Sequence, residues 1–132
     1  KIGALGARWG NGSERAFRQA LAAVLTESFG VEVLNINEYD DAGEVFCRTD
    51  QIEFDIIVRN GTLIIFELKS STDRSQLYIF SSKIAFYEKR HQRKAGRKIL
   101  VSPFIHPCAQ ELAQELWIET YGNSTEVELE LS

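Results

Sequence analysis

Two acidic residues and a lysine lie close together in two neighbouring apolar segments of the chain. Asp55 falls within segment 52–58, and Glu67 and Lys69 end segment 62–69. A carboxylate inside an apolar strand is costly unless it is paired or binds a cation. Carboxylate oxygens suit Mg²⁺, and a bound Mg²⁺ can polarise a phosphate and activate a water molecule. The three residue types therefore suit metal-dependent hydrolysis of a phosphodiester bond, with the Lys69 ammonium beside the phosphate or the attacking water.

A β-hairpin would bring these three residues together. Segment 52–58 is rich in β-branched residues and predicts a strand, and the Asn60-Gly61 pair predicts a tight turn because both residues tolerate positive φ. Segment 62–69 predicts the returning strand. Its unbroken apolar run, 63–66, indicates burial on both faces, as expected in the centre of an α/β sheet.

The register of this hairpin decides whether the two carboxylates meet. A two-residue turn sets Asp55 opposite Phe66 and leaves Glu67 on the other face of the sheet. A three-residue loop with a glycine bulge would set Asp55 opposite Glu67 instead. Because a slip of one residue moves every side chain to the other face, the catalytic hypothesis requires this bulge or an equivalent distortion near Asp55.

Further elements follow from apolar periodicity and from capping residues. Asp73 with Gln76 three residues later predicts a capping box at the start of a helix, and Pro107 suits the first turn of another. The order of elements predicts an α/β fold with a mixed central sheet flanked by helices. The expected segments are a helix over 13–29, a strand over 31–39, helices over 74–91 and 107–116, and strands over 98–102 and 117–121.

Composition and length indicate a globular domain. The chain has 132 residues, a net charge of −4 and 44% hydrophobic residues, which argues against a protein that coats nucleic acid non-specifically. Cys47 and Cys108 are far apart and form no zinc-type spacing, so we expect a reducing, cytoplasmic location. We expect a nuclease-like domain over 13–122, a tail or edge strand over 123–132, and a segment over 1–12 truncated from an upstream region.

Basic residues crowd the second half of the helix expected over 74–91 and the segment after it. They could contact phosphates, because Lys and Arg displace counterions from nucleic acid. A solvated helix end is the alternative, since cations are favoured at helix C-termini. Trp117 is interpreted as a packing group. The expected nucleic-acid contacts are Lys83, Lys89, Arg90, Arg93 and Lys94.

Asp55, followed by Glu67-Leu68-Lys69 on a β-hairpin after an N-terminal helix, resembles the PD-(D/E)XK nuclease superfamily, whose fold is called restriction-endonuclease-like. The similarity extends to a prokaryotic branch in which a coiled coil often precedes the nuclease-like domain. It covers nearly the whole chain. The segments that carry it are 4–10, 13–17, 37–40, 50–55, 67–71 and 86–89.

The resemblance implies a nuclease that depends on Mg²⁺ or Mn²⁺ and does not decide between DNA and RNA. We expect the substrate to be DNA and the enzyme to be an endonuclease rather than an exonuclease. The resemblance implies metal ligands in Asp55, Glu67 and the carbonyl of Leu68. Glu14 in the first helix would be a further acidic residue, although a helix dipole also favours a carboxylate there.

Gln76 would contact the active site, although its capping role explains it equally well. Phe54 stands where the superfamily's motif has Pro. The alternatives are a catalytically inactive nuclease-fold module that binds nucleic acid or a protein partner, and an assembly role in which an upstream segment joins two copies as a homodimer.

Overall fold

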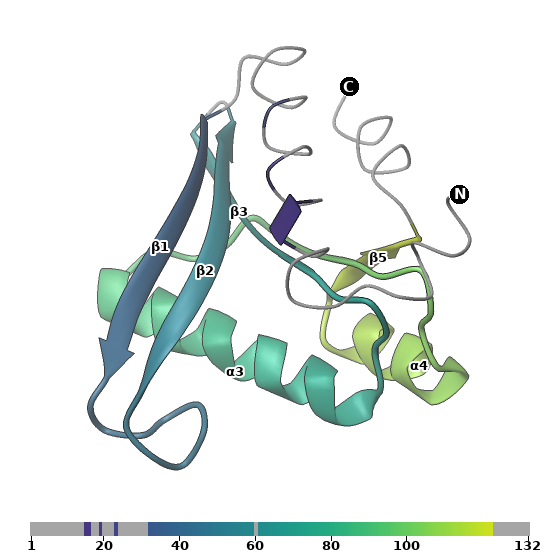
Figure 1. The fold of residues 1–132 in the computed structure, drawn as a ribbon. Helices are drawn as coiled ribbons and strands as arrows, with labels where there is room; N and C mark the ends of the chain where they lie inside the picture. The colour runs from purple at the N-terminus through teal and green to yellow at the C-terminus, as the bar shows by residue number, and fades with distance from the viewer. Residues whose placement is uncertain (1–14, 17–18, 20–22, 24–31, 60, 123–132) are drawn as a thin grey trace.

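A computed structural model describes residues 15–16, 19, 23, 32–59 and 61–122 of the chain. The expectations for Glu14, for segment 1–12, for most of the helix over 13–29 and for the tail over 123–132 lie outside these residues. The elements, shown in Figure 1, are β1 (Glu32–Asp40), β2 (Asp50–Arg59), β3 (Thr62–Leu68), α3 (Arg74–His91), β4 (Arg97–Val101), α4 (Pro107–Glu115) and β5 (Glu119–Tyr121).

The five strands form one mixed sheet in the order β1-β2-β3-β4-β5. β1, β2 and β3 pair antiparallel, whereas β3, β4 and β5 pair parallel. The antiparallel half is joined by hairpin connections, and the parallel half needs crossovers, which α3 and α4 supply. The predicted α/β class with a mixed sheet is confirmed.

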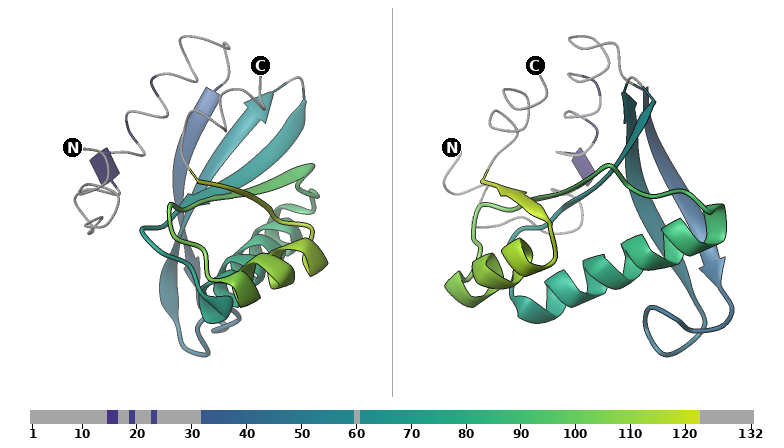
Figure 2. Two further views of the ribbon diagram at one scale, coloured as in Figure 1. Left: turned by 90° about the vertical axis from the view of Figure 1, so that its right-hand side faces the viewer. Right: turned by 180° about the vertical axis from the view of Figure 1, so that it is seen from behind.

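Helices α3 and α4 cover the same face of the sheet (Figure 2). Phe54 of β2 packs against α3, with its ring centroid 5.1 Å from that of Tyr87 and 6.2 Å from that of Phe86. Such aromatic pairs add to the stability gained from apolar burial. Sheet residues in this core are Ile52, Phe54 and Ile56 of β2, Leu63 and Ile65 of β3, and Leu100 of β4.

The central strand β3 is buried on both faces, as its apolar run predicts. Leu63 and Ile65 belong to the core beneath α3, while Ile64 and Phe66 alternate with them toward the other face. All four side chains are at most 3% exposed. A polar residue on this strand is therefore held in a mostly dry environment, which strengthens any ion pair it makes.

Local sequence signals set the starts of both helices. The Asp73 carboxylate accepts from the Gln76 amide at 3.0 Å, and the Gln76 side chain accepts from the Asp73 amide at 3.0 Å, so the predicted capping box is confirmed. Pro107 occupies the first turn of α4, as expected, and His106 caps it by accepting from the Cys108 amide.

Asp40 organises the loop between β1 and β2. Its buried carboxylate accepts hydrogen bonds from the amides of Glu44 and Val45 at 3.0 and 2.9 Å. Burial alone would raise the pKa of Asp40, but these amides outweigh burial and leave the pKa lowered. Gly43 in the same loop has φ of +70°, and a Cβ there would lie 2.9 Å from the Arg48 amide nitrogen.

Two expectations near the C-terminus need correction. The last strand begins at Glu119 rather than at residue 117. Trp117 is 84% exposed and has φ of +60°, so the interpretation of Trp117 as a packing group is wrong. The backbone turns at Trp117 to connect α4 to β5, which carries the indole away from the core.

None of the helices that the structure describes is long and apolar enough to cross a membrane.

Candidate active site

The hairpin register places the two carboxylates on opposite faces of the sheet. Asp55 pairs with Phe66, and the ladder continues to Arg59 opposite Thr62 without an extra residue. The glycine bulge that would set Asp55 opposite Glu67 is therefore not formed, because Arg59 pairs directly with Thr62. Since Phe54 and Ile65 face α3, alternation directs Asp55 away from α3 and Glu67 toward it.

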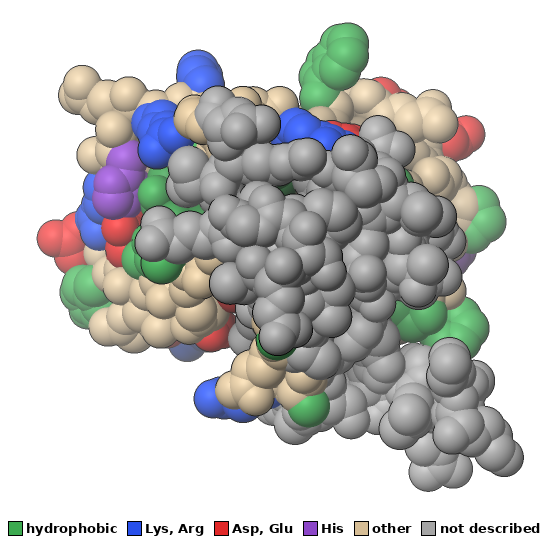
Figure 3. Space-filling view, turned by 90° about the horizontal axis from the view of Figure 1, so that it is seen from above, with side chains coloured by type: hydrophobic (Ala, Val, Ile, Leu, Met, Phe, Trp, Pro, Cys, Tyr) green, Lys and Arg blue, Asp and Glu red, His purple; other side chains and the backbone are tan. Residues whose placement is uncertain are grey.

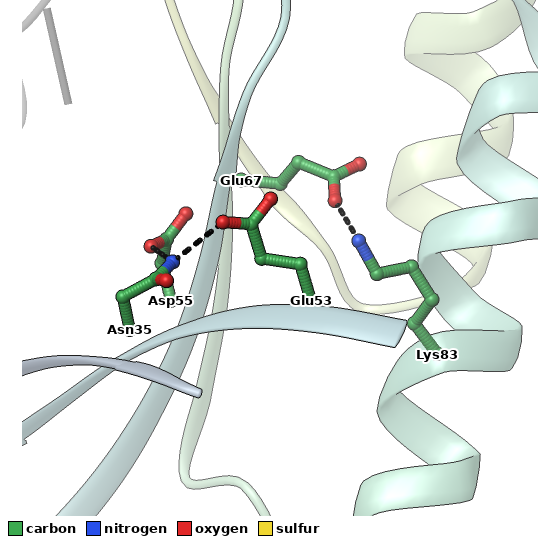
Figure 4. Close-up of polar contacts among 5 residues, drawn as sticks. All are labelled: Asn35, Glu53, Asp55, Glu67 and Lys83. Atoms are coloured by element: carbon green, nitrogen blue, oxygen red, sulfur yellow. Dashed lines mark hydrogen bonds and ion pairs between the residues drawn. The ribbon is translucent and has the colours of Figure 1, made fainter. Parts of the chain in front are cut away.

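Asp55 belongs to a polar cluster on β1 and β2. The Asn35 side-chain amide donates to Asp55 Oδ1 at 2.8 Å and to Glu53 Oε2 at 2.9 Å. Asn35 and Asp55 are directly opposite in the ladder, and Glu53 lies two residues from Asp55 on the same face. Figure 4 shows the amide between the two carboxylates. One amide thus holds two like charges together, while Asp55 itself is only 5% exposed.

Glu67 is held from the other side, by α3. Its Oε1 atom lies 2.5 Å from the Lys83 Nζ atom, and the two side chains are 11% and 14% exposed. Figure 4 shows Glu67 extending toward α3 and Asp55 turning toward Asn35. The carboxylate of Glu67 is therefore neutralised by an ammonium group that the sequence pattern assigned to a surface cluster.

Lys69 follows β3 directly and is partly exposed. Its backbone amide donates to the Val101 carbonyl at 3.0 Å, which ties the end of β3 to β4. The Lys69 ammonium makes no hydrogen bond or ion pair with any residue that the structure describes. Leu68 is 1% exposed and pairs with Val101. Lys69 is thus anchored through its backbone, and its ammonium, two residues after Glu67 in the sequence, has no partner among the described residues.

The remaining basic residues expected to contact nucleic acid lie in the last turns of α3 and just beyond it. Arg90 donates to the Tyr39 carbonyl and stacks over Phe86, and Arg93 donates to the Gly61 carbonyl. These contacts connect α3 to the β1 and β2–β3 regions. The other pairs are Lys89 with Glu44 at 3.3 Å and Lys94 with Glu88 at 3.8 Å.

On the face that Figure 3 shows, the described Lys and Arg side chains are scattered, and some lie near Asp and Glu side chains. Lys83 differs from Lys89, Arg90, Arg93 and Lys94 because it is turned toward the sheet and mostly buried. The structure therefore separates Lys83 from the predicted surface group.

Three residues that sequence reasoning did not place in the site are now part of it: Asn35, Glu53 and, in a new role, Lys83. Glu53 could have been placed near Asp55 from the sequence, because residues two apart on a strand share one face. Asn35 and Lys83 come from β1 and α3, so only the pairing of β1 with β2 and the packing of α3 reveal them.

The carboxylate oxygens of Asp55 and Glu67 are suitable ligands for a divalent ion, but their observed positions are not suitable for sharing one. Carboxylate oxygens are the ligands that Mg²⁺ and Mn²⁺ prefer. Among the described residues, however, no three His, Cys, Asp or Glu side chains converge as metal ligands. Nitrogen donors from Asn35 and Lys83 contact the carboxylates instead. The observed arrangement therefore does not fit a single ion shared by Asp55 and Glu67.

A cavity in the described part of the chain lies away from the two carboxylates. It has a volume of about 550 Å³ and lies between the loop after β3 and the loop after β4. Gln76 lines it, together with residues 71–73 and 103–106. Gln76 also accepts a hydrogen bond from the Asp73 amide in the capping box of α3.

Comparisons with known proteins agree with this fold. Residues 1–49 match a family described as a protein of unknown function, DUF3782. Residues 50–119, more than half of the chain, match a model described as PD-(D/E)XK nuclease superfamily. No curated protein was found to match. A solved structure of EndoMS in its apo form superposes with a TM-score of 0.59 at 18% identity, over 86% of this chain.

The aligned part makes up 47% of the EndoMS chain, so this chain spans about half the length of that structure. At this identity the similarity concerns the fold. The family model covers β2, β3, α3, β4, α4 and the start of β5, which are the elements around Asp55, Glu67 and Lys69. The chain belongs to the PD-(D/E)XK nuclease superfamily.

Proposed function

We propose that the chain is a nuclease that hydrolyses phosphodiester bonds of nucleic acid, DNA in preference to RNA, with Mg²⁺ or Mn²⁺, and that it cuts internally. The observation that carries the proposal is the position of Asp55, Glu67 and Lys69. Asp55 forms the last pair of the β2–β3 ladder, and Glu67 and Lys69 lie just past that pair, where β3 continues beside β4.

In this proposal Asp55 and Glu67 hold the metal, with the Leu68 carbonyl, and Glu14 adds a further carboxylate from outside the described residues. When bound, the ion would supply charge stabilisation at the phosphate and an activated water. Because the carboxylates contact Asn35 and Lys83 and point to different faces of the sheet, a shared ion requires these contacts to break and the strand ends to rearrange. We assign no further step to the ion.

Lys69 is the residue best placed to act on the substrate directly. Its ammonium is unpaired among the described residues and partly exposed, while its backbone is tied to β4. A positioned ammonium can orient a phosphate and stabilise the charge that develops on it. Lys89, Arg90, Arg93 and Lys94 remain proposed contacts to the nucleic-acid backbone, although they also make intramolecular contacts.

The second candidate is a nuclease-fold module that binds nucleic acid or a protein partner without turnover. Its support is the register that directs Asp55 and Glu67 to different faces.

A cytoplasmic location and a homodimer remain predictions from the sequence.

Incubation with supercoiled plasmid DNA, with Mg²⁺, Mn²⁺ or chelator, tests the proposal. Nicked or linear product that requires a divalent ion is expected. Asp55→Asn, Glu67→Gln and Lys69→Met should each slow cleavage by about a hundred-fold or more, as loss of a transition-state charge does. Glu111→Gln, which changes one exposed acid on α4, is the matched control. Salt-dependent DNA binding without cleavage would favour the binding module, and a parallel RNA assay tests the substrate preference.

A further inference from the structure

Lys83 and Glu67 form the most buried ion pair among the described residues. Their side chains are 14% and 11% exposed, whereas the Lys89–Glu44 pair is 76% and 39% exposed. Exposed pairs contribute little because water and salt screen them. A buried pair is different, because removal of one partner leaves an uncompensated charge in a poorly solvated place. The contact between Lys83 and Glu67 should therefore strongly affect what else Glu67 can bind.

Lys83 is distinct from the lysine that the catalytic motif supplies. Lys69 comes from the end of β3, two residues after Glu67, and has no described partner. Lys83 comes from the middle of α3 and reaches the strand across the helix–sheet packing. Among the described residues, Lys83 is the one whose ammonium pairs with Glu67.

This pair contributes to the poor fit between the observed carboxylates and a shared divalent ion, together with the strand register and the Asn35 contact. An ammonium and a metal ion are both cations, so at the same carboxylate they compete for lone pairs and repel one another. We propose that Lys83 is a positioning residue that pairs with Glu67 and competes with a divalent ion for its carboxylate. The inference deepens the proposed function and rests on Glu67 being a metal ligand.

Because coupling between two ligands of one site is reciprocal, the lysine should weaken metal binding as much as the metal weakens the ion pair. Removal of the Lys83 charge should therefore raise metal affinity. A lysine that only stabilised the fold would not have this effect. Metal affinity is thus a readout that separates the positioning role from a purely structural one.

The experiment measures Mn²⁺ binding to the full chain by electron paramagnetic resonance, which counts free Mn²⁺. Lys83→Met removes the charge and keeps most of the apolar stem. Lys83→Gln is the second variant, because its amide can still donate to Glu67 and leaves no buried carboxylate unpaired. Lys98→Met is the matched control: Lys98 is partly buried, and its ammonium donates to the Leu116 carbonyl at 3.4 Å.

Lys83→Met should bind Mn²⁺ at least about five-fold more tightly than the wild type, the lower end of usual coupling between sites. Lys83→Gln should shift affinity in the same direction, and Lys98→Met should not. Adding Glu67→Gln to Lys83→Met should abolish the gain. Unchanged or weaker Mn²⁺ binding in whichever Lys83 variant keeps the wild-type circular dichroism spectrum overturns the inference, as does an equal gain in Lys98→Met.

The plasmid assay distinguishes failure of this inference from failure of the proposed function. Tighter Mn²⁺ binding without any DNA cleavage by the wild type would support the role of Lys83 and contradict the nuclease proposal. Metal-dependent cleavage by the wild type, with unchanged Mn²⁺ affinity in the Lys83 variants, would support the nuclease proposal and contradict the role of Lys83.

Discussion

Asp55 lies opposite Phe66, one residue short of Glu67, and this pair is the last of the β2–β3 ladder. Before Asp55, β2 pairs with β1 only, and after Phe66, β3 pairs with β4 only. The acidic residues therefore lie where the two strands part. Asp55 is held through Asn35 of β1, and Glu67 through Lys83 of α3. Each carboxylate thus depends on an element outside the hairpin.

Asn35→Ala should lower the free energy of unfolding by about 2 kcal/mol, because a hydrogen bond to a charged group contributes about 1.5–3 kcal/mol to stability. The amide serves both Glu53 and Asp55, so its loss also exposes their mutual repulsion. Urea unfolding measures the change. Asn37→Ala, two residues along the same strand face, is the control and should change little. Equal effects of both variants would contradict a specific role for Asn35.

Gln76→Ala should lower the free energy of unfolding by about 1 kcal/mol, because it removes one half of the capping box of α3. The plasmid assay on the same variant separates this role from catalysis. We expect cleavage to fall by less than about ten-fold at a temperature where the variant stays folded. A hundred-fold loss of cleavage with unchanged stability would instead place Gln76 among the residues that contact substrate.

Glu119 should make stability depend on acid pH. The Arg97 guanidinium hydrogen-bonds Glu119 at 2.8 and 2.5 Å, burial acts in the opposite sense, and Tyr121 adds a bond, so the pKa of Glu119 lies below its ordinary value of 4.5. A carboxyl with a lowered folded-state pKa stabilises the fold above its unfolded-state pKa. That contribution disappears as the pH falls through the folded-state pKa.

Glu119→Gln should therefore cost about 1 kcal/mol at pH 7, a modest value because the pair is partly exposed and screened. The difference from the wild type should shrink below pH 4.5. Urea unfolding at a series of pH values measures it, with Glu115→Gln on the exposed side of α4 as the control. A difference that stays constant down to pH 3 would show that Arg97 and Glu119 are not coupled in this way.

Gly43→Ala and Gly61→Ala should differ in cost although both glycines have positive φ, of +70° and +80°. A Cβ at Gly43 would meet the Arg48 backbone at 2.9 Å, whereas nothing lies within 4 Å of one at Gly61. Gly61→Ala should cost about 1 kcal/mol from backbone strain alone, and Gly43→Ala more. Thermal unfolding measures both. A larger loss for Gly61→Ala would show that the β1–β2 loop relaxes around the added methyl group.

Much of the fold could be read from local signals. The apolar run of β3 indicated a strand buried on both faces, and the Asp73–Gln76 pair indicated the start of α3. These succeed because the period of apolar residues and the chemistry of a helix cap depend on residues close in sequence. Trp117 shows the limit: its type suggests packing, but the turn between α4 and β5 exposes it.

The sequence by itself determined that Asp55, Glu67 and Lys69 lie on one hairpin of an α/β domain, because the turn and the two strands are specified locally. Only the tertiary structure decided the partners of the two carboxylates. The two-residue connection directs Asp55 and Glu67 to different faces, and β1 and α3 then bring in Asn35 and Lys83. Those contacts join residues distant in the chain, whose meeting depends on how strands pair and helices pack rather than on any local pattern.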